Sequence, residues 1–195
     1  MTMQTKINFL GSPTEIPKKI EGWNHTFQLA KPYVKENGIG VDVGCREGGF
    51  AREMEKDFTH IHCFDFRDKK KMFEKNVIDM SKFTYHVCGI GQEEGTAFTT
   101  SHKVGRIKDG GGVAVSIKTI DSFNLENVTF IKYDIEGYEL KAIQGSENTI
   151  KKYYPVVVVE QNKGNTDAKE LLEAWGYTCK GIDKVFNQDY IMVKE

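Results

Sequence analysis

Short apolar runs alternate with amphipathic stretches along most of the chain. Five runs have the length and composition of buried strands: 39–43, 60–66, 83–88, 128–133 and 156–159. Five stretches are predicted to be helical: 24–36, which precedes the first strand, and 49–56, 69–75, 139–152 and 167–175, of which 69–75 is mainly charged. Because strands and helices alternate, we predict an α/β fold in which a doubly wound, mostly parallel sheet carries helices on both faces.

Two later segments depart from this alternation. Residues 96–115 contain Gly105 and the glycine run 110–112, which the interior of a helix or strand tolerates poorly. We therefore predict a mobile loop between short strands there. The apolar runs 177–181 and 190–193 instead predict an antiparallel pair that ends the sheet.

The length of 195 residues fits one domain with a modest extension. Residues 1–20 are irregular, with Pro13 and Pro17 as breakers, and a helical stripe follows them. We expect residues 1–37 to be an N-terminal extension whose helix packs on a single domain formed by residues 38–195.

The composition argues against nucleic-acid binding, membrane insertion and secretion. Lys and Arg total 27 and Asp and Glu total 28, so the net charge of −1 provides no basic field for a nucleic-acid partner. The longest strongly apolar run has four valines, far below the ~20 residues of a membrane helix. The first residues lack the apolar core of a signal peptide, and the four cysteines lack C-x-x-C spacing. We expect a cytoplasmic protein with free thiols and no membrane partner.

The chain has 19 glycines, and several follow the first predicted strand. Gly44, Gly48 and Gly49 form the pattern G-x-x-x-G-G, after which a helix begins. Such a loop lets the backbone approach a ligand closely, although similar loops also occur as plain turns. It lacks the G-x-G-x-x-G of a dinucleotide site, which favours a ligand without a pyrophosphate.

An acidic residue follows the second predicted strand. Asp65 lies 21 residues beyond Gly44, close to the ~20-residue offset at which a carboxylate meets ribose hydroxyls. A carboxylate accepts hydrogen bonds from both hydroxyls at once. The alternative role for Asp65 is to cap the next helix.

Further carboxylates cluster where the other strands end. Asp134, Glu136 and Glu139 follow the fourth strand, Glu160 follows the fifth and Asp42 lies in the first. Carboxylates gathered in one crevice repel each other unless a cation balances them. S-adenosyl-L-methionine carries a sulfonium cation and a ribose but no phosphate, so it matches both the cluster and the glycine loop.

Methyl transfer to a hydroxyl needs a base within hydrogen-bond reach of that hydroxyl. The candidate catalytic residues are Asp134 and Glu160, with Glu136 next. Structural roles stay open, since Asp134 is also suited to binding backbone and Glu160 to pairing with Lys132 or Lys163. No third clear ligand accompanies Asp134 and Glu136, so we predict no metal site.

Three further polar residues are open to structural roles. His86 lies within a predicted strand and is expected to pack rather than to act in catalysis. His102 lies on the predicted loop, where a lone histidine is usually solvated, and Asp121 suits a cap or a turn.

Several segments, in order, resemble the FkbM family of S-adenosylmethionine-dependent methyltransferases over about residues 39–161. They are Val41-Asp42-Val43-Gly44, Phe64-Asp65 where the family usually has Phe-Glu-Pro, Gly89-Ile90-Gly91 before Glu94-Gly95, Thr119-Ile120-Asp121, and the block Ile131 to Glu139. The last of these, with its Lys-x-Asp-x-Glu-Gly-x-Glu pattern, is the most specific segment of the chain.

The resemblance implies a class I, Rossmann-like methyltransferase fold whose seven-stranded sheet ends in an antiparallel hairpin. It implies a methionine side lined by Asp42, Gly44 and Gly48, a ribose site at Asp65, and Asp134, Glu136 and Glu160 near the transferred methyl. The cofactor site it implies is Asp42, Gly44, Arg46, Gly48, Asp65, Phe66 and Asp134.

Two positions depart from the family pattern. Cys45-Arg46 stands where the family usually has Ala-Asn, and Arg46 is able to pair with the cofactor carboxylate or with Glu47, or to point to solvent. Phe66 replaces the usual proline.

We therefore expect a methyltransferase that uses S-adenosyl-L-methionine, acts on a sugar or glycan hydroxyl or a related small molecule, and exists as a monomer or homodimer. The alternatives are a catalytically inactive module that binds this cofactor and, less favoured by the missing G-x-G-x-x-G, a nicotinamide-dependent oxidoreductase.

Overall fold

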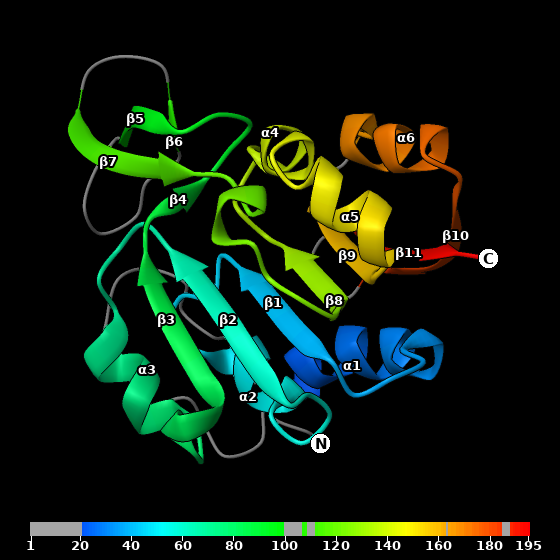
Figure 1. Cartoon of the computed structure of the whole chain (residues 1–195), viewed down its shortest axis with the longest axis horizontal. Helices are drawn as coiled ribbons and strands as arrows, with labels where there is room; N and C mark the ends of the chain where they lie inside the picture. Colours follow the sequence, from blue (N-terminus) through cyan, green and yellow to red (C-terminus); the bar gives the residue numbers. More distant parts are fainter. Residues whose placement is uncertain (1–20, 100–106, 109–111, 163, 185–187) are drawn as a thin grey trace, which may run out of the picture.

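A seven-stranded sheet forms the centre of the computed structural model, which describes residues 21–99, 107–108, 112–162, 164–184 and 188–195 (Figure 1). The strand order is β10-β11-β9-β8-β1-β2-β3. The strands are β1 (Ile39–Val43), β2 (His60–Asp65), β3 (Phe83–Val87), β8 (Val128–Tyr133), β9 (Val156–Gln161), β10 (Tyr177–Asp183) and β11 (Gln188–Lys194). All pairings are parallel except those of β11, which runs antiparallel to both neighbours. The predicted sheet and its antiparallel C-terminal pair are confirmed.

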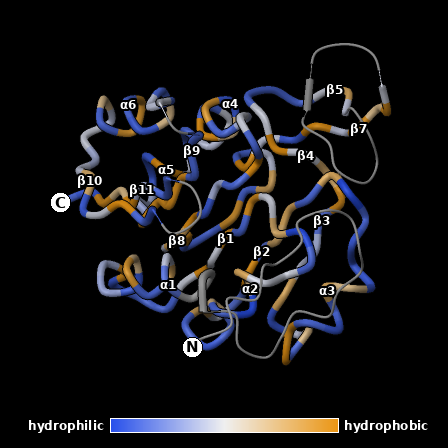
Figure 2. Tube along the Cα trace, turned by 180° about the vertical axis from the view of Figure 1, so that it is seen from behind, coloured by the Kyte–Doolittle hydropathy of each residue, from blue (hydrophilic) through white to orange (hydrophobic). Residues whose placement is uncertain are grey.

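Helices cover both faces of this sheet. One face carries α1 (Glu21–Ala30), α2 (Gly49–Met54) and α3 (Lys70–Asn76), and the other carries α4 (Glu139–Gln144), α5 (Glu147–Tyr153) and α6 (Asp167–Ala174). Val157 and Val159 pack into one core and Val156 and Val158 into the other, as expected for a strand covered on both faces. Figure 2 shows hydrophobic positions concentrated along the central strands. No described helix has the length and hydropathy to cross a membrane.

The first described helix packs tightly against the domain. Phe27 of α1 is fully buried, and its ring lies 5.6 Å from that of Phe130, 5.9 Å from that of Phe50 and 6.1 Å from that of Phe58. The N-terminal helix therefore shares the core of the domain. Whether residue 37 marks a domain boundary stays a prediction, and residues 1–20 lie outside the described part of the chain.

The prediction of one helix over 139–152 was wrong, because the chain breaks between α4 and α5 at Gly145 and Ser146. A β-carbon at position 145 would lie 1.9 Å from the carbonyl oxygen of Gly91, so backbone from the other segment passes directly over Gly145. The hydroxyl of Ser146 donates to the carbonyl of Ala142 at 2.7 Å. The break between α4 and α5 therefore coincides with a tertiary contact, which the spacing of apolar residues does not reveal.

Short strands border the middle of the segment 96–115, as predicted. A second sheet, of order β4-β7-β5-β6, is built from β4 (Gly89–Ile90), β5 (Gly95–Thr99), β6 (Ile107–Lys108) and β7 (Val113–Lys118). Its main pairing, β5 with β7, is antiparallel and joins residues far apart in the sequence. His102 and the glycines at 110 and 111 lie outside the described residues.

Candidate functional site

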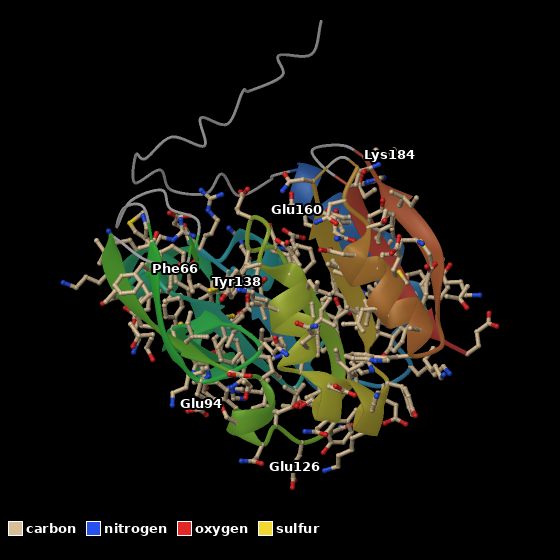
Figure 3. All side chains as sticks on the ribbon, turned by 90° about the horizontal axis from the view of Figure 1, so that it is seen from above. Phe66, Glu94, Glu126, Tyr138, Glu160 and Lys184 are labelled. Carbon is tan, nitrogen blue, oxygen red and sulfur yellow. The ribbon has the colours of Figure 1, made fainter. Side chains whose placement is uncertain are left out.

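The predicted site residues come from four neighbouring strands whose carboxyl ends share one edge of the sheet. Gly44 follows β1, Asp65 ends β2, Asp134 follows β8 and Glu160 lies near the end of β9. Figure 3 looks onto this part of the molecule and shows Phe66, Tyr138 and Glu160 spread across it, away from Glu94 and Glu126. Ligands of open α/β sheets bind at such an edge.

The glycine loop is shaped by three residues with left-handed backbone. The φ angles are 90° at Gly44, 49° at Arg46 and 87° at Gly48. A β-carbon at Gly44 would lie 1.9 Å from the carbonyl oxygen of Asp134, so only glycine lets the ends of β1 and β8 approach this closely. The backbone of Arg46 has a conformation that residues other than glycine rarely adopt. Such backbone strain concentrates at functional sites.

Asp65 is buried, and its carboxylate already has four hydrogen bonds. Its Oδ1 accepts from the backbone N–H and the Nε of Arg67, both at 2.8 Å. Its Oδ2 accepts from the Nη2 of Arg67 at 2.8 Å and from the backbone N–H of Arg46 at 3.1 Å. Arg67 was not predicted from the sequence, because an arginine two residues after a strand has no distinctive signal.

A buried cation lies among the carboxylates of the site. The Nζ of Lys132 is 2.9 Å from Asp134 Oδ2 and 3.8 Å from Asp42 Oδ1, and it lies 4.9 Å from the centre of the Phe50 ring. Burial opposes the charge of Lys132, but Asp134 and Asp42 outweigh it and hold its pKa above the ordinary value. The cluster is thus partly balanced from within, by a residue that sequence reasoning considered only as a partner of Glu160.

Asp42 lies fully buried beneath the glycine loop. Neither carboxylate oxygen accepts a hydrogen bond of normal geometry from a described residue. Burial raises its pKa from 3.8 to about 6, because Lys132 offsets only part of the desolvation and Asp134 and Asp65 add to the repulsion. An incompletely paired buried carboxylate is costly, and a nearby cationic ligand would reduce that cost.

Asp134 and Glu160 form a carboxyl pair. Glu160 lies close enough to Asp134 to influence its ionisation. Burial pushes the pKa of Asp134 upward, but Lys132, Glu160 and Arg46 outweigh it and hold that pKa at about 2. Asp134 is therefore an ionised carboxylate that lies next to the carboxyl group of Glu160.

Two predicted carboxylates take other places. Glu139 is buried, and its carboxylate accepts from the backbone N–H groups of Ile135 at 3.0 Å and Gly137 at 2.9 Å. These bonds clamp the loop after β8. Burial, to which the charge of Asp134 adds, raises the pKa of Glu139 despite the backbone N–H groups that bind it. Glu136 is exposed on that loop, at a φ of 60°.

The other polar candidates have structural contacts. The carboxylate of Asp121 accepts from the backbone N–H groups of Asn148 and Thr149 and from the Thr149 hydroxyl at 2.7–3.0 Å, which caps α5. His86 stacks on Phe64 with 4.4 Å between the ring centres, as expected for a packed histidine. Arg46 approaches Glu47, with Nε 3.9 Å from Oε2. Among the described residues, no group of three or more His, Cys, Asp or Glu is arranged to hold a metal ion.

A family model described as "Methyltransferase FkbM domain" matches residues 30–181. The chain belongs to the FkbM methyltransferase family. The match includes the glycine loop, Asp65 and the carboxyl pair, and it begins within α1.

Solved structures of methyltransferases share this fold. The FkbM methyltransferase of Methylobacillus flagellatus is 19% identical with a TM-score of 0.61, over 80% of this chain but only 43% of that one. A precorrin-6y C5,15-methyltransferase of Geobacter metallireducens is 14% identical with a TM-score of 0.55, over 93% of this chain and 94% of that one. At these identities the likeness establishes the class I, Rossmann-like methyltransferase fold.

One solved neighbour contains the cofactor. A Streptococcus pneumoniae protein proposed to be a tRNA (m1A22) methyltransferase, solved with S-adenosyl-L-methionine, is 13% identical with a TM-score of 0.51. The alignment covers 87% of this chain and 70% of that one. A search of curated proteins found no significant relative. The roles of the individual FkbM site residues in this chain stay predictions.

Proposed function

We propose that this FkbM-family chain transfers a methyl group from S-adenosyl-L-methionine to a hydroxyl of a sugar, a glycan or a related small molecule. The observation that carries the proposal is the meeting of the glycine loop, Asp65 and the Asp134–Glu160 pair at one edge of the sheet. At this edge, the backbone of the glycine loop allows a ligand to approach closely. The carboxylate of Asp65 is suited to binding ribose hydroxyls, and the Asp134–Glu160 pair is suited to accepting a proton.

The residues present fit a cationic ligand without phosphates. The unsatisfied carboxylate of Asp42 and the ionised Asp134 favour positive charge near the glycine loop. In this proposal Gly44 and Gly48 let backbone lie against the methionine part, Asp65 takes the ribose and Phe66 lies along the adenine. The bound cofactor supplies an electrophilic methyl group on a positively charged sulfur.

In this proposal the carboxyl pair handles the proton of the acceptor hydroxyl. When the hydroxyl oxygen bonds to the methyl carbon, the carbon–sulfur bond breaks, and the hydroxyl proton passes to a carboxylate. With a pKa of about 2, Asp134 is a weak base, so its charge suits it to stabilising positive charge. We therefore assign proton removal to Glu160 and positioning to Asp134, and we assign contact with the acceptor to the exposed Glu136.

The first test is cofactor binding to the full chain. Calorimetric titration with S-adenosyl-L-homocysteine and S-adenosyl-L-methionine is expected to show saturable binding that Asp65→Ala weakens by at least about tenfold, the equivalent of ~1.4 kcal/mol. The matched control is Asp68→Ala, because Asp68 is an exposed carboxylate three positions along the chain. Absence of binding to the wild type would overturn the proposal, and saturable binding of NADH instead would favour an oxidoreductase.

The second test is turnover. Transfer of labelled methyl from the cofactor to a panel of sugars, glycans and sugar-bearing metabolites is expected to identify an acceptor. With that acceptor, Glu160→Gln is expected to lower kcat at least about 100-fold while cofactor affinity stays within about threefold. Cofactor binding without turnover on the whole panel would instead support an inactive binding module.

A further inference from the structure

Arg67 fills the hydrogen-bonding capacity of the carboxylate to which we assign the ribose. A carboxylate has about four acceptor sites, two on each oxygen. At Asp65, two of the four bonds come from backbone N–H groups, one to each oxygen. The other two come from the Arg67 guanidinium, again one to each oxygen at 2.8 Å. A ribose diol needs the two sites that the guanidinium holds.

The same guanidinium also covers the neighbouring aromatic ring. The Cζ of Arg67 lies 4.9 Å from the centre of the Phe66 ring. Phe66 is the residue to which we assign the adenine, and a planar guanidinium and a planar purine cannot occupy the same face of one ring. Arg67 is 14% exposed and the Asp65 side chain 1%, so the ion pair is shielded from water and geometrically well defined.

The charge of a second carboxylate, Glu47, reaches Arg67. The charge of Glu47 acts on the Arg67 guanidinium and, together with Asp65, raises its pKa against the effect of burial. Glu47 is partly exposed and already attracts Lys69, whose Nζ lies 3.2 Å from its Oε1. If the guanidinium leaves Asp65, Glu47 therefore still provides a negative charge near it.

We propose that Arg67 is an internal competitor for the adenosine of the cofactor, occupying the ribose site on Asp65 and the ring face of Phe66 until the cofactor displaces it toward Glu47. This inference rests on the proposed function. The free energy needed to break the Asp65–Arg67 pair is subtracted from the binding energy of the cofactor, so the measured affinity is lower than that of an open site.

The test compares variants that keep or remove the competitor. Calorimetric titration with S-adenosyl-L-homocysteine is expected to show that Arg67→Met binds about tenfold more tightly than the wild type. The matched control is Arg52→Met, the same replacement on α2, which is expected to bind as the wild type does. Arg67→Lys, which keeps the charge but not the two-pronged hydrogen bonding, is expected to lie between them.

A second readout follows Arg67 itself. In spectra of the ¹⁵N-labelled wild type, the Nε–H of Arg67 is expected to show slow exchange with water in the free protein. Saturation with S-adenosyl-L-homocysteine is expected to shift this signal and speed its exchange.

The outcomes separate the two proposals. Tighter binding by Arg67→Met, with a displaced Nε–H signal in the wild type, supports the competitor role. Equal or weaker binding by a folded Arg67→Met overturns it while leaving the proposed function intact. If Arg67→Met does not fold, an Arg67→Lys variant that binds no more tightly than the wild type overturns it. Absence of binding in every variant overturns the proposed function, and the competitor role with it.

Discussion

At the scale of single residues, charge balance governs the candidate site. Lys132 lies between Asp134 at 2.9 Å and Asp42 at 3.8 Å, so one buried ammonium offsets two carboxylates. The negative charge of Asp42 is offset only in part, because neither of its carboxylate oxygens accepts a hydrogen bond of normal geometry from the described residues. A site that carries this excess negative charge gives up stability in favour of attracting a cation.

Asp42→Asn tests this cost. The pKa of Asp42 is raised from 3.8 to about 6 in the folded protein. The stabilisation that comes from binding this proton is therefore fully present at a pH below 3.8, and it is lost as the pH rises through about 6. We therefore expect the variant to gain stability relative to the wild type between about pH 4 and about pH 8, by up to ~3 kcal/mol. Chemical denaturation of both proteins at the two pH values measures the gain.

The comparison across pH cancels the fixed cost of placing an asparagine in the interior. A stability difference that is the same at both pH values would show that Asp42 does not change its ionisation over this range. Cofactor titration of the same variant is expected to show weaker binding, because the site loses negative charge.

At the scale of elements, a carboxylate from one segment organises the start of a helix from another. The Asp121 side chain accepts three hydrogen bonds from Asn148 and Thr149, in the first turn of α5. The close contact of Gly145 with the Gly91 backbone lies at the break between α4 and α5, and α5 begins just after it. Thr119-Ile120-Asp121, which resembles a family segment, thus has a structural purpose.

Asp121→Ala is expected to lower the free energy of unfolding by about 1–2 kcal/mol, the usual cost of losing a helix cap. Cofactor affinity is expected to stay unchanged, because Asp121 holds α5 and not the crevice. Chemical denaturation and calorimetric titration measure the two quantities. The control Glu74→Ala removes an exposed carboxylate from α3 and is expected to change stability by less than ~0.5 kcal/mol. A loss of cofactor affinity in Asp121→Ala would place this residue in the site.

At the scale of the whole molecule, α1 closes one of the two cores. Phe27 is fully buried among Phe50, Phe58 and Phe130, which come from α2, the segment after it and β8. The helix also contacts the C-terminal pair, where the Thr26 hydroxyl lies 2.7 Å from Asp183 and 2.8 Å from Asp189. The first described helix therefore packs against the last two strands of the chain (Figure 1).

Phe27→Ala is expected to destabilise the protein by about 3–5 kcal/mol, since it removes a large ring and leaves a cavity. Leu29→Ala on the same helix is the control, because Leu29 is 39% exposed and is expected to cost below ~1 kcal/mol. Thermal and chemical unfolding measure both. Equal losses in the two variants would mean that α1 is held by something other than its buried aromatic face.

The sequence was sufficient for the sheet because the signals of its strands are local. The four valines of β9 alternate between two cores, and the antiparallel β10 and β11 read as separate apolar runs. Burial of apolar surface dictates such patterns within a few residues. The strand-end positions of Gly44, Asp65, Asp134 and Glu160 follow from the same patterns.

Tertiary structure alone decided how the side chains of the site pair. Arg67 on Asp65, Lys132 between Asp42 and Asp134, and Glu139 on the backbone of its own loop depend on distances that residue spacing does not encode. Periodicity reports which face is buried, whereas an ion pair depends on where several chain segments meet in space. The sequence by itself therefore determined the central sheet and which residues end its strands, and the packed structure determined which of their charges are already satisfied.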